Sequence, residues 1–167
     1  MMAQLFIVVF GLGLPMALLS YLLLHWSYES GWLSRDSDNK AHRAALKEMK
    51  KAARKKDIPG ANFVTKKWLR FGGGCYGAAG LWTLLVAELA DLFSLIINWP
   101  GIGQFFAGGP VNFLVGFIKN QVQNFVTAIT WFDYWSDVAG DANIGLVFLV
   151  AVGGYSLGKR AAKAGWI

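Results

Sequence analysis

Apolar and polar stretches alternate along the chain in a pattern that predicts three membrane-spanning helices. The first apolar stretch, 5–26, contains no Asp, Glu, Lys or Arg, and the others cover 72–99 and 142–158. An α-helix rises about 1.5 Å per residue, so about 20 apolar residues cross the roughly 30 Å hydrocarbon layer of a bilayer. The third stretch, with about 17 residues, is near the minimum length. Pro15 lies inside the first stretch, where a neighbouring helix must cover the carbonyl that proline leaves free.

The polar segment 29–71 predicts a basic helix between the first two spans. Asp36 and Asp38 are suited to its N-terminal cap, and Pro59 is suited to end it. Small or weakly apolar side chains recur on one face of this helix at helical spacing, namely Ala41, Ala45, Met49 and Ala52. We therefore expect a helix that shows a mainly polar and basic surface.

Positive charge gathers in two places. Of the 16 Lys and Arg residues, all but Lys119 lie within 35–70 or 159–163. Cytoplasmic loops of membrane proteins carry an excess of Lys and Arg, so both clusters are expected in the cytoplasm. Three spans then place the N-terminus outside and the C-terminus in the cytoplasm, and we expect a bacterial inner membrane. A fourth span would separate the two clusters, against this rule.

The segment 100–141 is ambiguous. Polar or small side chains share one helical face of 111–132, and large apolar side chains lie elsewhere. We expect an amphipathic helix that lies in the outer interface and forms part of a periplasmic-side cap. A re-entrant loop within 101–132, or a fourth span there, stays open. Aromatic side chains are expected at the level of the lipid headgroups, namely Trp131, Phe132, Tyr134 and Trp135.

These patterns predict an all-α integral membrane protein with three transmembrane helices, a basic cytoplasmic helix and an amphipathic interfacial helix on the outer side. A chain of 167 residues with 16% charged side chains leaves no room for a separate soluble domain. The expected divisions are 1–28 (first transmembrane helix), 29–71 (basic cytoplasmic loop and helix), 72–99 (second transmembrane helix), 100–141 (periplasmic-side cap) and 142–167 (third transmembrane helix and basic cytoplasmic tail).

One face of the second span carries the sharpest chemical signal. At 100° per residue, a groove of small residues continues into Glu88 and Asp91. A carboxylate in the membrane costs about 2.5–3.5 kcal/mol, so the two should face protein or water. They could dock a partner subunit, form a proton or cation pathway, or lie near the outer interface. Trp82, on the opposite side, is expected to face lipid.

Small residues predict where helices approach closely. They occur in the second span as Gly73, Gly77 and Gly80, and in the third span as Gly154 and Gly158. One of these two faces is expected to pack within the chain. Three short spans rarely use both faces for packing within one chain. The remaining small-residue face therefore predicts docking of other membrane subunits.

The basic residues are expected to lie at the cytoplasmic surface and to contact anionic lipid headgroups, each contributing about 1 kcal/mol. They are Lys50, Lys51, Arg54, Lys55, Lys56, Lys66, Lys67, Arg70, Lys159 and Arg160. A nucleic acid is not expected as a partner, because no aromatic residue interrupts the basic run within 40–57.

Motifs for catalysis are missing from the sequence. Cys75 is the single cysteine, only His25 and His42 carry imidazoles, and no hydrolase, phosphate-loop or metalloprotease motif occurs. We therefore expect no enzyme, no metal and no cofactor. The sequence favours an accessory, structural or assembly subunit of a larger inner-membrane complex. The alternative is a transport component that conducts protons or cations through Glu88 and Asp91.

Overall fold

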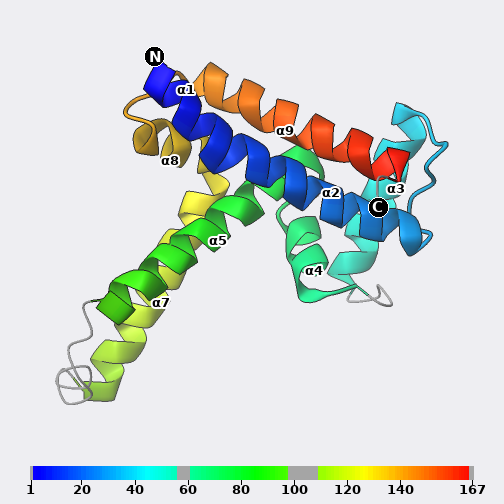
Figure 1. Ribbon diagram of the computed structural model, residues 1–167. Helices are drawn as coiled ribbons and strands as arrows, with labels where there is room; N and C mark the ends of the chain where they lie inside the picture. The colour runs from blue at the N-terminus through cyan, green and yellow to red at the C-terminus, as the bar shows by residue number, and fades with distance from the viewer. Residues whose placement is uncertain (1, 56–60, 98–108, 166–167) are drawn as a thin grey trace.

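The computed structural model describes residues 2–55, 61–97 and 109–165, and within these ranges the protein is helical without a strand (Figure 1). The elements in chain order are α1 (Met2–Val8), the π-helical turn η1 (Val9–Gly13), α2 (Leu14–Glu29), α3 (Asn39–Arg54), α4 (Phe63–Arg70), α5 (Gly74–Ile97), α7 (Gly109–Ile129), α8 (Trp131–Val138) and α9 (Ile144–Ala164).

Three helices among the described residues are long and apolar enough to cross a membrane, as the sequence predicts. They are the continuous run Met2–Glu29, then Gly74–Ile97 and Ile144–Ala164. The basic helix α3 also forms, and its N-terminal cap is the predicted Asp38, whose Oδ1 accepts a hydrogen bond of 2.7 Å from the backbone N–H of Ala41. Pro59 lies outside the described residues.

α2 and α9 lie side by side, run in the same direction and form the most extensive helix contact among the described residues (Figure 1). Two glycines of α9 make the close approach possible. A Cβ atom at Gly154 would overlap the carbonyl oxygen of Gly13, and one at Gly158 would overlap that of Ala17. The small face of the third span is therefore used within the chain, against the first span.

A side chain from α5 donates a hydrogen bond to the backbone carbonyl that Pro15 leaves free in the first span. Pro15 has no N–H to donate to Gly11, four residues earlier, and the chain passes through the π-helical turn there. The indole Nε1 of Trp82 donates to the Gly11 carbonyl oxygen at 2.8 Å. The prediction that Trp82 faces lipid is wrong, because its side chain is half-buried and its indole N–H bonds to η1.

α8 contributes to the core rather than to an outer aromatic belt. Trp131 and Trp135 are 1% and 4% exposed, so these two side chains pack inside the protein and do not form a surface that contacts lipid headgroups. The Trp135 Nε1 donates to the Thr83 Oγ1 at 2.9 Å, and its ring lies against Gly11. The Trp135 side chain, which the sequence places in an aromatic belt, instead joins α8 to α5 and to the first span.

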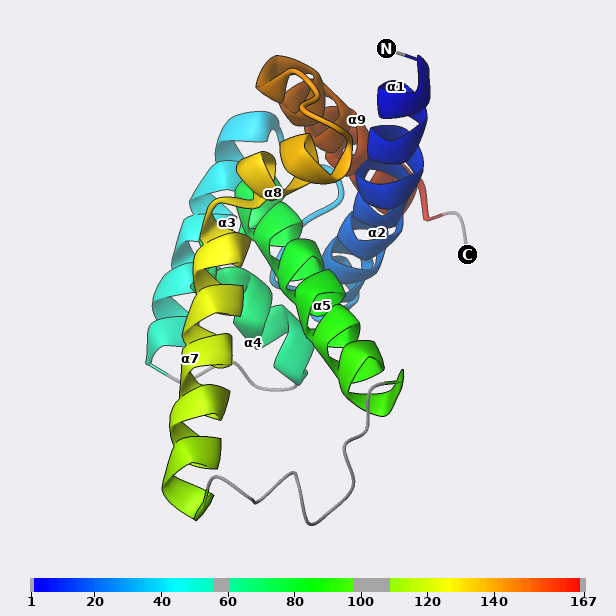
Figure 2. The ribbon, with the colours of Figure 1, turned by 90° about the vertical axis from the view of Figure 1, so that its left-hand side faces the viewer.

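α5 does not lie alongside α2 and α9. It crosses them near its N-terminal half and then leaves the body with α7, which returns beside it in the opposite direction (Figures 1 and 2). The predicted helix within 111–132 therefore exists, as part of α7, and it packs against α5. The re-entrant loop considered for this region begins at 101, and its residues 101–108 lie outside the described residues.

Candidate docking arm and basic surface

The outer half of the α5–α7 hairpin forms a long exposed surface among the described residues. We name residues 89–97 of α5 and 111–123 of α7 the distal arm. Every residue of 89–97 is exposed, and so is every residue of 111–123 whose side chain is described. Figure 1 shows these parts of α5 and α7 extending together away from the other helices. Two helices alone cannot bury an apolar side chain on all sides, so the distal arm is incomplete without an environment that covers it.

Much of the distal arm is strongly apolar. On α5 the most exposed large side chains are Ile97 (77%) and, at 61% each, Phe93 and Ile96. On α7 the apolar side chains with more than half of their surface exposed are Val111, Leu114, Val115, Phe117, Ile118 and Val122. A continuous exposed surface of this kind is typical of a protein–protein or membrane contact.

Polar side chains interrupt this surface on α7. Lys119, Asn120, Gln121 and Gln123 are all exposed and occupy just over one turn in the middle of the helix. The same part of α5 offers only apolar residues and Ser94 on its outer turns. The distal arm therefore has one helix suited to hydrocarbon and one helix with a polar band.

The carboxylates of α5 lie at the base of the distal arm. The Asp91 Oδ2 accepts a hydrogen bond of 2.8 Å from the Asn124 Nδ2 of α7, and Glu88 is half-buried one turn earlier. Among the described residues neither carboxylate forms an ion pair, and Lys119 is exposed farther along α7. Asp91 thus contacts the partner helix of its own hairpin and helps to hold α7 against α5.

The small face of α5 is also occupied within the chain. A Cβ at Gly77 would lie 2.8 Å from the Trp68 carbonyl oxygen, and a Cβ at Gly80 would lie 2.8 Å from that of Ala128. Gly73 adopts a φ of 63° in the turn between α4 and α5, a conformation that favours glycine. The glycines of both candidate spans therefore pack against other helices of this chain, and the distal arm stays exposed among the described residues.

The two basic clusters meet at one end of the α2–α9 pair. The Lys159 Nζ donates to the Asn39 Oδ1 at 3.2 Å, and the Lys163 Nζ donates to the Ser37 carbonyl oxygen at 3.4 Å. Most of the cations that the sequence assigns to the lipid surface are exposed: Lys51, Arg54, Lys55, Lys66, Arg70 and Arg160. Lys50, Lys67 and Lys159 are partly buried. Lys56 lies outside the described residues.

His42 lies buried where α3 meets the basic end of α9. Its side chain is 4% exposed, and its Nε2 has no hydrogen-bond partner within the described chain. Burial, and to a smaller extent the positive charges of Lys159 and Lys163, together lower the pKa of His42 from 6.5 to about 4. Sequence reasoning missed this position, although His42 precedes Ala45 and Met49 at helical spacing and so continues the buried stripe of α3.

No cluster of three His, Cys, Asp or Glu side chains that could hold a metal ion occurs in the part of the chain that the structure describes. Comparisons with protein-family models, curated proteins and solved structures give no match to this chain. A function has to follow from the exposed surfaces and their chemistry.

Proposed function

We propose that this protein is a multi-pass inner-membrane protein that serves as an accessory, structural or assembly subunit of a larger complex. In this proposal the N-terminus lies outside and the C-terminus in the cytoplasm. The observation that supports it is the distal arm, whose two helices expose apolar and polar side chains together. Neither water nor lipid alone satisfies both.

A bilayer suits the α5 side of the distal arm. Large side chains such as Leu92, Phe93 and Ile96 are at least half exposed, and burial of each away from water is worth about 1.5–3 kcal/mol. In water this surface would promote aggregation. We therefore place α5, the continuous run Met2–Glu29 and α9 in the membrane, consistent with their length and hydropathy.

A second polypeptide suits the α7 side. A lysine at the centre of a bilayer costs about 2.5–3.5 kcal/mol, and exposed amide side chains there need hydrogen-bond partners. Lys119, Gln121 and Gln123 would obtain these partners from polar groups on a helix of another subunit. Docking through the polar band of α7 replaces docking through the glycine faces, because those faces are filled by this chain itself.

The arrangement of charge supports the proposed orientation. The hydrogen bonds from Lys159 and Lys163 to the start of α3 bring both basic clusters to one end of the molecule. Such an end is typical of a cytoplasmic face, where anionic lipid also contributes about 1 kcal/mol per cation.

Co-purification tests the proposal. The protein would be extracted from native membranes in a mild detergent through a tag at its C-terminus, and its companions identified by native gel and mass spectrometry. We expect a stoichiometric larger complex. Lys119→Leu should reduce the recovered companions several-fold, whereas Lys40→Leu, the same change at an exposed position of α3, should not.

The alternative function is conduction of protons or cations, which the polar contact of Asp91 with Asn124 inside the hairpin favours. The paired substitutions Glu88→Gln and Asp91→Asn separate the two functions. Loss of companions supports docking, whereas intact assembly with a lower ion flux in liposomes supports conduction. If both assembly and flux are unchanged, these carboxylates serve neither function.

A further inference from the structure

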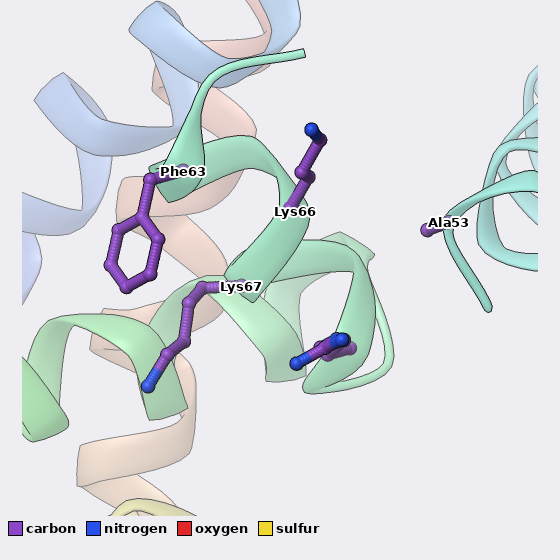
Figure 3. A pocket seen from close by; sticks show the side chains of 5 residues that line it. Ala53, Phe63, Lys66 and Lys67 are labelled. Atoms are coloured by element: carbon purple, nitrogen blue, oxygen red, sulfur yellow. The ribbon is translucent and has the colours of Figure 1, made fainter. Parts of the chain in front are cut away.

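The described residues that line a pocket beside α4 are all cationic or apolar. Its walls are Ala53 from the end of α3 and Phe63, Lys66, Lys67 and Arg70 from α4. Figure 3 shows Ala53 across the opening from Lys66, and Phe63 beside Lys67 on another side of the same helix. α4 immediately precedes α5, so the pocket lies where the chain enters its second candidate span.

No described residue supplies a counter-ion to this pocket. None of the described residues that line it is acidic, and none of its three cations forms an ion pair with another described residue. Lys66 and Arg70 are four residues apart and therefore lie on one face of α4. Cations that line one pocket repel one another, and an anion bound among them relieves this repulsion. The pocket therefore suits an anionic group such as a phosphate, which both side-chain types bind.

The apolar wall points to an amphiphile rather than to a free anion. Phe63 is 74% exposed and Val64 is 37% exposed on the first turn of α4. The Lys67 Nζ lies 5.6 Å from the centre of the Phe63 ring, so a cation and an exposed aromatic ring share one surface. A free phosphate would use the cations and leave the ring in water, whereas a phospholipid would use both.

We propose that this pocket is a discrete binding site for an anionic phospholipid. Its phosphate accepts hydrogen bonds from Lys66 and Arg70, with Lys67 adding charge, and its acyl chains pass over Phe63. This differs from diffuse attraction to the whole basic surface, because one pocket holds one headgroup. The inference rests on the proposed membrane location, and it is independent of the proposed partner subunits.

Native mass spectrometry of the intact protein in a neutral detergent tests the site, with graded additions of phosphatidylglycerol or phosphatidylcholine. We expect the first bound phosphatidylglycerol to be retained preferentially. Lys66→Gln with Arg70→Gln should weaken its binding by about tenfold or more. The matched control, Lys40→Gln with Arg43→Gln, removes the same charge from exposed positions of α3 and should change binding less than about twofold.

Phe63→Ser distinguishes a lipid from a free anion. It should weaken phosphatidylglycerol binding and leave binding of inorganic phosphate unchanged. Equal losses in the pocket and control variants, equal retention of the two lipids, or an unaltered lipid affinity in Phe63→Ser would each overturn the proposal. Size-exclusion profiles establish that the variants stay folded, and extraction of membranes at alkaline pH tests the membrane location separately.

Discussion

Protonation of His42 should destabilise the contact of α3 with the body. The imidazole is buried between α3 and the ends of α2 and α9, with the Tyr28 ring centre 6.5 Å from its own. Lys159 and Lys163 face it from α9. A proton on this ring would be a buried positive charge beside two others, and no acidic side chain is among the groups that shift its pKa.

The pKa values of His42 in the unfolded and folded protein give the direction and size of the change in stability with pH. The pKa of His42 is 6.5 in an unfolded chain and about 4 in the folded protein, so between these values the unfolded chain binds more protons. The stability from neutral His42 is complete above pH 6.5 and is lost as the pH falls toward 4. The difference between the two pKa values corresponds to at most about 3 kcal/mol of stability. Because α3 has one face in water, we expect about 1–2 kcal/mol after solvent screening.

Thermal unfolding of the purified protein between pH 7.5 and pH 4.5 measures this effect. About 1–2 kcal/mol corresponds to a fall in Tm of about 3–6 °C for a chain of this size. In His42→Leu this part of the fall should disappear, while Tm at pH 7.5 stays close to that of the natural protein, because the change removes an unpaired nitrogen.

Arg43→Gln, the matched control on an exposed position of the same helix, should retain the whole acid-induced fall. An identical pH profile in His42→Leu and the natural protein would refute the assignment of this effect to His42. So would a large loss of stability in His42→Leu at pH 7.5, because the imidazole would then make a favourable contact that the structure does not contain.

Further predictions concern the helix contacts of the first span. Gly158→Ala should destabilise the protein by about 1–3 kcal/mol, seen as a lower Tm, because its methyl group would overlap α2. Gly153→Ala is the control: with open space around it, the change should leave Tm the same or raise it by up to about 4 °C, because alanine favours a helix more than glycine does. Trp82→Phe should cost about 1 kcal/mol through loss of the hydrogen bond to Gly11. That loss should shrink when Pro15→Ala restores a backbone donor, and additive effects of the two changes would contradict the proposed role of the indole.

Features that depend on residues close together in the chain were predictable from the sequence, whereas features that depend on distant residues were not. The three apolar helices and the Asp38 cap depend on residues close together in the chain, and both were predictable. Spacing also showed that Gly154 and Gly158 share a face, but it could not show that α2 fills that face. The partner of a small surface is decided by three-dimensional packing, which local periodicity does not record.

The two tryptophans of α8 show why the outer segment was harder to predict. An aromatic run after an amphipathic helix is expected both at a membrane interface and in a core. The choice depends on whether each indole N–H finds a partner, and the partner of Trp135 is Thr83, 52 residues away. The distal arm has the same difficulty, since its polar band was visible in the sequence but its exposure depends on α5 and α7 packing only on each other.

Site-specific photo-crosslinking in native membranes tests the central claim most directly. A photoreactive amino acid would replace Gln121 or Gln123 in the polar band of α7, and Leu149 or Leu157 at exposed positions of α9 as controls. The account predicts that both α7 positions crosslink to one defined membrane protein and that the α9 positions give lipid adducts only. Lipid adducts from all four positions, or crosslinks from α7 only to a second copy of this chain, would contradict an accessory subunit that docks through the distal arm.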